Sequence, residues 1–169
     1  NTDVDGIRQA IQIDDKANAF YYASEQINLP DTSEDYAPLV LGNYILGAGA
    51  LSSRLGDRVR QQEGLSYTVR SMVSPRAKDE RTDLTIYAIT NPENKEKLID
   101  VIIEEVKKLV ADGVTEEELA DAKEAYLQSA KVSRTSDGAL AGELQNHLFL
   151  GRTMQFTQEF EQRIADATV

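Results

Sequence analysis

The chain has 169 residues, 41% of them hydrophobic, which is enough for a single domain with a buried core. Its formal net charge is −11, from 18 lysines and arginines against 29 aspartates and glutamates. This balance argues against nucleic acid and anionic membranes as partners, because both are bound through clustered basic side chains.

Counts of single residue types exclude several kinds of site. The chain has no cysteine, so it can form neither a disulfide nor a thiolate metal site. His147 is the only histidine, which rules out a catalytic zinc site built from two or three imidazoles of this chain. No apolar run approaches the roughly 20 residues that a membrane span requires, so we expect no membrane span in this segment.

The N-terminal part is predicted to contain a strand followed by a helix. Residues 1–18 form a polar lead-in, and the aromatic run at 19–24 predicts a strand with at least one buried face. Apolar residues at helical spacing then predict a helix over about 33–46. Thr32 and Asp35 have the spacing of a capping box at its start.

A second, shorter helix and a β-hairpin are predicted next. The helix ends at Gly64, a residue type that commonly terminates helices. Its apolar stripe is formed by Leu51, Leu55 and Val59. Residues 65–73 then alternate with a period of two, and 82–90 are rich in β-forming residues. These two strands are predicted to pair across the polar loop 74–81.

The rest of the chain is predicted to be helical. One helix begins after Asn91 and ends at Gly113, and another opens with the capping box of Thr115 and Glu118. Two further helices carry the apolar stripes Leu140, Leu144 and Leu148, and Phe156, Phe160 and Ile164.

Three strands and six helical segments place the chain in the α/β (α+β) class, with a mixed, largely antiparallel sheet packed against several helices. We interpret residues 19–169 as a single α/β domain. Three strands barely cover the faces that so many amphipathic helices must bury, so a further strand is expected beyond the ends of the sequence. On this interpretation the domain is truncated at its C-terminal end and excised from a longer chain.

Three patterns that superficially suggest a site have simpler explanations. The glycine cluster at 47–52 follows a helix, whereas a dinucleotide-binding loop follows a strand, so we expect it to let helices and sheet approach closely. A serine hydrolase would need His147 to reach Ser52 or Ser53, and neither serine lies in a nucleophile-elbow pattern. The carboxylates at 116–118 lack the alternating spacing of a calcium loop and suit a helix N-terminus.

Arg60 and Tyr67 are the strongest candidates for a functional pair. Arg60 falls in the last turn of a predicted helix, the chain reverses near Gly64, and Tyr67 begins the next strand. Both polar tips can therefore project past the same end of this element pair. A guanidinium and a phenol that converge there are two donors suited to a peptide carbonyl or a developing oxyanion. Each residue also has a structural explanation, as a cation at a helix C-terminus and as a tyrosine on a half-buried strand.

The segment Leu41–Val69, LGNYILGAGALSSRLGDRVRQQEGLSYTV, closely resembles the C-terminal, zinc-free domain of the pitrilysin/insulinase (inverzincin) family of zinc metallopeptidases. The matching features are the small-residue cluster before Ser-Arg-Leu, the helix that ends in Arg, and the Gly-Leu-x-Tyr that follows. The segment Asp137–Thr153 also resembles the later helical part of this domain in bacterial members. The resemblance implies a half-domain of the mitochondrial-processing-peptidase type.

The resemblance also implies a role for the candidate pair. In this family two homologous α/β domains close like a clamshell, and one of them holds zinc through HxxEH and a further Glu. The other contributes an Arg and a Tyr seven positions apart, which contact the substrate near the scissile bond. Arg60 and Tyr67 have this spacing, so the resemblance implies that they hold the substrate carbonyl and help to stabilise the tetrahedral intermediate.

The zinc motif HxxEH is absent from this chain, so we expect it to be inactive alone and to hold no cofactor. Zinc is expected in a homologous partner domain, either in the same polypeptide or in a partner subunit, and the substrate is expected to be a peptide. The alternative is a catalytically inactive family member that acts as a structural or partner-binding subunit. Bacterial relatives favour a periplasmic or otherwise extracytoplasmic location over the cytoplasm.

Overall fold

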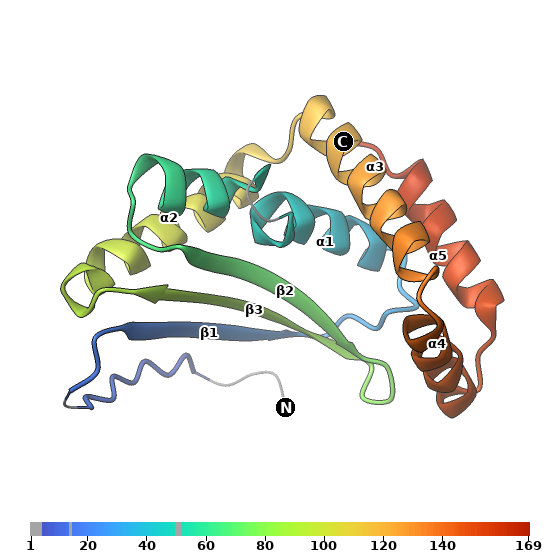
Figure 1. Cartoon of the computed structure of the whole chain (residues 1–169). Coiled ribbons are helices and arrows are strands. Elements are labelled where there is room, and N and C mark those ends of the chain that lie inside the picture. The colour runs from blue at the N-terminus through green and yellow to red at the C-terminus, as the bar shows by residue number, and fades with distance from the viewer. Residues whose placement is uncertain (1–4, 14, 50–51) are drawn as a thin grey trace.

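The computed structural model describes residues 5–13, 15–49 and 52–169, and it confirms the expected mixed α+β architecture (Figure 1). The strands are β1 (Ala19–Ile27), β2 (Thr68–Arg76) and β3 (Arg81–Thr90). The helical elements are α1 (Tyr36–Asn43), η1 (Tyr44–Ala48), η3 (Gly56–Gln62), η4 (Pro92–Asn94), α2 (Lys95–Asp112), α3 (Glu116–Ser133), α4 (Asp137–Leu150) and α5 (Met154–Asp166).

The strands form one antiparallel sheet in the order β1-β3-β2. Figure 1 shows α1, η3 and α2 over one face of this sheet and α3, α4 and α5 beyond one of its ends. The other face carries no helix in the described part of the chain. The three segments that the sequence predicts as strands do form strands. β3 lies in the middle of the sheet because it pairs with both β1 and β2.

The hairpin of β2 and β3 is confirmed, but its turn is shorter than predicted. The strands stay paired up to Arg76 and Arg81, so the turn is made by residues 77–80 and not by the whole of 74–81. Arg76 Nε donates to Asp83 Oδ2 across the strands at 2.6 Å. This ion pair extends the ladder into a polar stretch that local patterning predicts as a loop.

The first helix begins later than predicted, at Tyr36. The predicted capping box of Thr32 and Asp35 is wrong, because Asp35 occupies the N-cap position and its side chain makes no capping hydrogen bond. Two successive turns precede the helix, in which Ser33 N donates to Pro30 O at 3.0 Å and Tyr36 N donates to Ser33 O at 3.2 Å. These turns satisfy amides that a capping side chain would otherwise bond.

A π-helix, η1, continues α1 and brings Gly47 against β2. A Cβ atom at Gly47 would lie 2.6 Å from Ser71 Oγ and 2.7 Å from Ser71 N, so no side chain fits there without a shift of the strand. Ser71 is buried and its hydroxyl donates to Asn43 O at 3.2 Å. This confirms that small residues let helix and sheet approach closely. Ala50 of the predicted glycine cluster and Leu51 of the predicted apolar stripe of the second helix lie outside the described residues.

Two apolar clusters form the core. The first fills the space between the sheet and the helices η3 and α2, and its buried members are Leu46, Leu55, Val59, Leu65, Val69, Ile86, Ala88, Leu98, Val101 and Ile102. The second joins α1 to α3 and α5, and its buried members are Tyr36, Ala37, Leu41, Ile45, Leu119, Ala122, Phe160 and Ile164. The predicted second helix is confirmed, and Leu55 and Val59 of its stripe are buried, although its hydrogen bonding is that of a π-helix.

The helices predicted after Asn91 are confirmed. Asn91 Oδ1 accepts from Glu93 N at 3.0 Å at the first of them, and the capping box of Thr115 and Glu118 is complete. Gly151 follows α4 with a φ of 67°, the left-handed conformation that often ends a helix. Among the described residues, no helix is both long and apolar enough to span a membrane.

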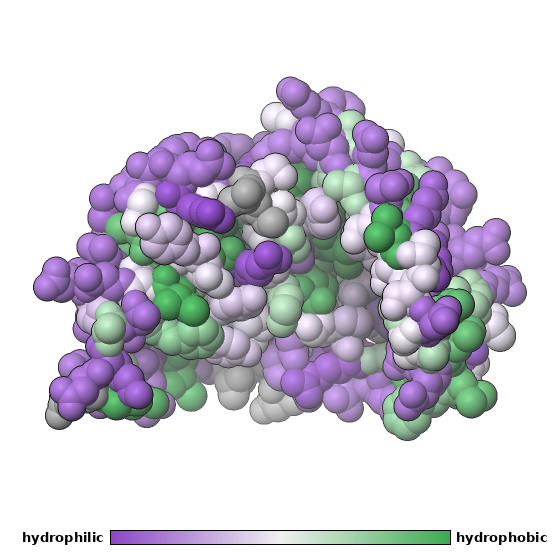
Figure 2. All heavy atoms as spheres, in the orientation of Figure 1, coloured by the Kyte–Doolittle hydropathy of each residue, from purple (hydrophilic) through white to green (hydrophobic). Residues whose placement is uncertain are grey.

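The fourth α-helix, α4, buries its histidine and exposes two leucines of its predicted apolar stripe. His147 is 7% exposed, whereas Leu144 is 47% and Leu148 is 83% exposed. His147 Nε2 lies 2.9 Å from Thr157 Oγ1 of α5, and Thr157 in turn donates to Glu143 Oε1 at 2.6 Å. In Figure 2, hydrophobic residues gather at the lower right, where α4 lies. The lone histidine is therefore structural, as its helical position suggests.

Glu118 joins the start of α3 to Arg54, and we expect this contact to make stability depend on acid pH. Arg54 Nε and Nη2 each bond one oxygen of Glu118 at 2.7 Å. Hydrogen bonding to Arg54 is the main cause that lowers the pKa of Glu118 from 4.5 to about 2. Since the folded pKa is depressed, the stabilisation is present at neutral pH and is lost as the pH falls from 4.5 towards 2.

The measurement is the free energy of unfolding of the wild type and of Glu118→Gln between pH 7 and pH 2. The difference between the two proteins should be largest at neutral pH and should shrink below pH 4.5. Glu117→Gln is the matched control, because Glu117 is exposed in the same helical turn. A pH-independent difference for Glu118→Gln would contradict the assigned ion pair.

Candidate functional site

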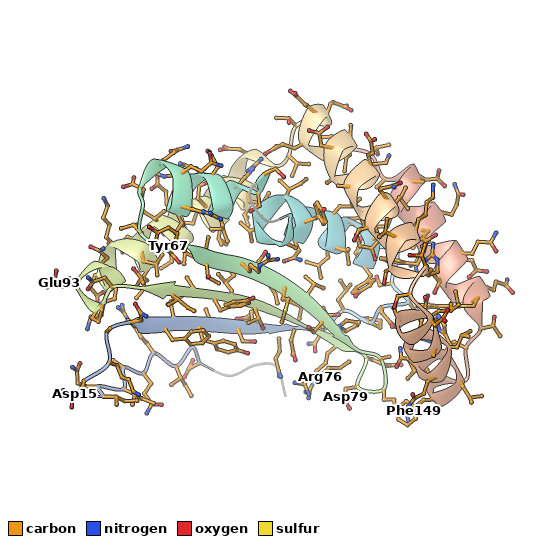
Figure 3. All side chains as sticks on the ribbon, viewed as in Figure 1. Asp15, Tyr67, Arg76, Asp79, Glu93 and Phe149 are labelled. Atoms are coloured by element: carbon orange, nitrogen blue, oxygen red, sulfur yellow. The ribbon has the colours of Figure 1, made fainter. Side chains whose placement is uncertain are left out.

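The structure places Arg60 and Tyr67 on either side of one chain reversal. Arg60 is exposed in the last turn of η3, and Tyr67, 89% exposed, directly precedes β2. Figure 3 shows Tyr67 at the start of β2, beside η3. Gly64 makes the reversal with a φ of 62°, and Leu65 N closes it by donating to Val59 O at 2.9 Å. Arg60 and Tyr67 therefore lie at the same end of this element pair, on either side of the reversal.

The backbone that leads into Tyr67 is firmly anchored. Leu65 is buried in the core, and its carbonyl accepts from Thr90 Oγ1 at 2.6 Å. Ser66 is also buried, and its hydroxyl donates to Ile89 O at 2.6 Å. Both partners lie at the end of β3. Tyr67 thus projects into solvent from a segment that is fixed to the sheet, which suits a side chain that must meet a ligand in one orientation.

A network of ion pairs fixes the end of η3 that carries Arg60. Arg58 Nη1 bonds Glu63 Oε1 at 2.5 Å, and Lys97 Nζ of α2 lies 2.7 Å from Glu63 Oε2. Lys97 is the main cause that lowers the pKa of Glu63, with Arg58 contributing. Arg58 Nε also lies 3.7 Å from Oε1 of Glu105, which is buried in α2. Charge pairing therefore orients this turn, and the sequence does not reveal the whole network because Lys97 and Glu105 lie far from η3 in the chain.

The tips of Arg60 and Tyr67 are available to a ligand. Within residues 5–13, 15–49 and 52–169, neither side chain forms a hydrogen bond or an ion pair. Their neighbours Arg58 and Glu63, by contrast, are paired. A guanidinium brings up to five N–H donors and a phenol brings one O–H donor, so the pair can bond a carbonyl oxygen or a negatively charged oxygen.

The described residues do not supply a zinc site. No group of three or more histidine, aspartate and glutamate side chains in them could hold a metal ion. His147 is engaged with Thr157 between α4 and α5, whereas Ser53 Oγ accepts from Gly56 N before η3. The serine hydrolase arrangement is therefore not formed.

The helix-free face of the sheet carries exposed aromatic residues that sequence analysis did not single out. Phe20 is 64% and Tyr22 is 61% exposed, while Tyr21 between them is half-buried against the first core cluster. The alternation of exposed and half-buried residues along β1 could have signalled a face that is not covered by helices. The aromatic run by itself predicts a strand with at least one buried face and does not indicate which rings are exposed.

Comparison with known families identifies the class of protein. The family model described as the peptidase M16 inactive domain matches residues 3–126. The chain belongs to this family, which confirms the resemblance to the zinc-free domain of pitrilysin and insulinase metallopeptidases.

Among particular relatives, the chain is 30% identical over 146 residues to the non-peptidase homolog YmxG of Helicobacter pylori, covering 85% of the chain and 33% of that protein. It is 34% identical over 115 residues to an uncharacterized zinc protease YmxG of Bacillus subtilis, covering 68% of the chain and 27% of that protein. The chain therefore spans a third or less of the length of these relatives.

Solved structures show the same fold. A peptidase M16 inactive domain from Pseudomonas fluorescens matches with a TM-score of 0.79 and 27% identity, over 91% of this chain and 35% of that one. A protease from Helicobacter pylori matches with a TM-score of 0.81 and 19% identity, over 94% of this chain and 37% of that one. At 19% identity, the match to the Helicobacter pylori protease shows a shared fold only.

Proposed function

We propose that this chain is the substrate-binding, zinc-free domain of a zinc-dependent endopeptidase, in which Arg60 and Tyr67 contact the scissile region of a peptide. The observation that carries this proposal is the pair of unbonded polar tips held on an anchored chain reversal. Membership of the M16 family supplies the reaction class, and the seven-residue spacing matches the one implied by the resemblance.

The pair would act on the oxygen of the peptide carbonyl. Arg60 and Tyr67 donate hydrogen bonds to that oxygen and orient the scissile bond, and the same bonds strengthen as negative charge develops on it. Zinc, its ligands and the general base would belong to the homologous HxxEH domain, where the metal activates water. That domain would lie in the same polypeptide or in a partner subunit.

A second candidate function is a catalytically inactive scaffold that binds a partner. It is favoured by one observation, the non-peptidase designation of the 30% identical Helicobacter pylori relative. The two candidates differ in whether the assembled protein holds zinc and cleaves peptides.

The test uses the full-length polypeptide, alone and mixed with any HxxEH-bearing neighbour encoded beside it. We expect bound zinc in the assembled protein and cleavage of an unfolded peptide that stops on treatment with a chelator and returns with added zinc. A full-length sequence and neighbours without HxxEH, together with no cleavage, would establish the scaffold function instead.

A further inference from the structure

The helix-free face of the sheet carries a patch that we call the aromatic face, formed by Phe20, Tyr22, Arg70, Tyr87 and Ile89. The register places them on one side of the sheet, because Phe20 and Thr68 both lie opposite Ile89, and Tyr22 and Arg70 both lie opposite Tyr87. Directly opposed residues of antiparallel strands share a face. The helices α1, η3 and α2 cover the other face (Figure 1).

The ring of Phe20 stacks on two other rings of the aromatic face, those of Tyr22 and Tyr87. The ring centroid of Phe20 is 6.4 Å from that of Tyr22 and 6.2 Å from that of Tyr87, with interplanar angles of 21° and 25°. Ile89 extends this surface and is 40% exposed. A contiguous exposed group of large apolar side chains marks an interaction surface, whereas single exposed apolar residues do not.

Arg70 gives the aromatic face a cation that is free to bond. It is exposed near the start of β2, directly opposite Tyr87, and it has no ion pair or hydrogen bond within the described ranges of the chain. A free guanidinium is notable in a chain of net charge −11. Rings beside a guanidinium complement a peptide segment that has an apolar side chain and backbone carbonyl or carboxylate oxygens.

The aromatic face begins where the candidate site ends. Tyr67 directly precedes Thr68, which lies opposite Ile89, and Ile89 lies opposite Phe20. Neighbouring strands are about 4.8 Å apart, so Phe20 lies about 10 Å across the sheet from the start of β2. An extended peptide spans that distance in about three residues. A peptide held at Arg60 and Tyr67 can thus continue across the edge of β2 onto the aromatic face.

We propose that the aromatic face is a binding subsite for an extended peptide and selects an aromatic or large aliphatic side chain about three residues from the scissile bond. This inference rests on the proposed peptide-binding function and deepens it by naming the substrate class. The occupant is an unfolded peptide segment, because a strip of flat rings accepts a single extended chain and its apolar side chains.

The test measures peptide binding by full-length protein in the presence of a chelator, so that cleavage does not compete. Two labelled unstructured peptides are identical except for phenylalanine or serine about three residues from the expected cleavage position. The wild type should bind the phenylalanine peptide about tenfold more tightly. In the double variant Phe20→Ser, Tyr22→Ser this preference should fall to about twofold or less.

Leu148→Ser is the matched control, since Leu148 is an exposed apolar residue on α4, at the end of the sheet opposite Tyr67, and its variant should keep the tenfold preference. Thermal unfolding should be similar in all these proteins, because the substituted rings are exposed. A preference that survives in the double variant overturns the proposal. So does a melting temperature lowered by many degrees in that variant, which would mean that the face is buried against the rest of the polypeptide.

The same experiment separates this inference from the proposed function. The variants Arg60→Ala and Tyr67→Phe are tested for cleavage by the zinc-loaded protein. If they cleave normally while the binding preference depends on Phe20 and Tyr22, the proposed role of the pair fails and the aromatic face stands as a peptide subsite. If the pair is required and the preference is absent, only the inference about the aromatic face fails.

Discussion

Replacing Tyr67 by phenylalanine should lower the turnover of peptide substrates by the assembled enzyme roughly a hundredfold, because one oxyanion donor is typically worth about 3 kcal/mol. The ring remains, so the packing of the anchored segment around Leu65 and Ser66 should not change. Turnover and KM are measured on an unfolded peptide with the full-length, zinc-loaded protein. A loss confined to kcat would indicate an interaction formed mainly in the transition state.

Arg60→Ala should weaken both substrate binding and turnover, since the guanidinium can hold the ground-state carbonyl as well as the developing charge. Matched controls are Tyr21→Phe, which removes the hydroxyl of a half-buried tyrosine of β1, and Lys107→Ala, which removes an exposed cation of α2. Both control variants should cleave at the wild-type rate. Near-normal cleavage by Tyr67→Phe and Arg60→Ala would remove the proposed role of this pair.

Substitution of Gly47 by alanine should cost about 2 to 3 kcal/mol of stability, because an added methyl group must be forced into a packed interface. Its Cβ would lie 2.6 Å from Ser71 Oγ and 2.7 Å from the backbone nitrogen of Ser71. The serine hydroxyl could rotate, but the backbone of β2 can yield only by moving away from η1. The strand begins next to Tyr67, so the same substitution should also reduce peptide binding.

The free energy of unfolding in urea checks this prediction, with Gly42→Ala as the control. Gly42 lies in α1, and a Cβ atom there would meet nothing within 4 Å. Alanine has a higher helix propensity than glycine, so the Gly42→Ala variant should be as stable as the wild type or more stable by up to about 1 kcal/mol. Equal effects of the two substitutions would contradict the close approach of η1 and β2.

Much of the fold was predictable from local patterning. Alternation with a period of two marks β2, β-forming residues mark β3, and complete local signals such as the capping box of Thr115 and Glu118 mark α3. Similarly, Gly64 marks the reversal that brings Arg60 and Tyr67 to one end of their element pair. These features depend on residues that lie within a few positions of one another, so the sequence contains all of the information needed.

The incorrect predictions concern the limits of two elements, which hydrogen bonds of the folded chain decide. The capping box of Thr32 and Asp35 gives way to turns around Ser33. The hairpin turn is shortened by the ion pair of Arg76 and Asp83, which joins two strands. In both cases the sequence shows the spacing of the side chains. The hydrogen bonds that decide where α1 begins and where the β2–β3 turn ends form only in the folded chain.

The sequence by itself determined that this chain has too few histidines and no cysteine for a zinc site, and that an arginine and a tyrosine flank one reversal. The tertiary structure alone decided how that pair is presented, because the anchors of Tyr67 come from Ile89 and Thr90 and those of η3 come from Lys97. It also decided that Phe20 and Tyr22 face solvent. The physical reason is that a side chain of β1 is exposed only if it lies on the face of the sheet without helices. The helices that cover the opposite face, α1, η3 and α2, come from later parts of the chain.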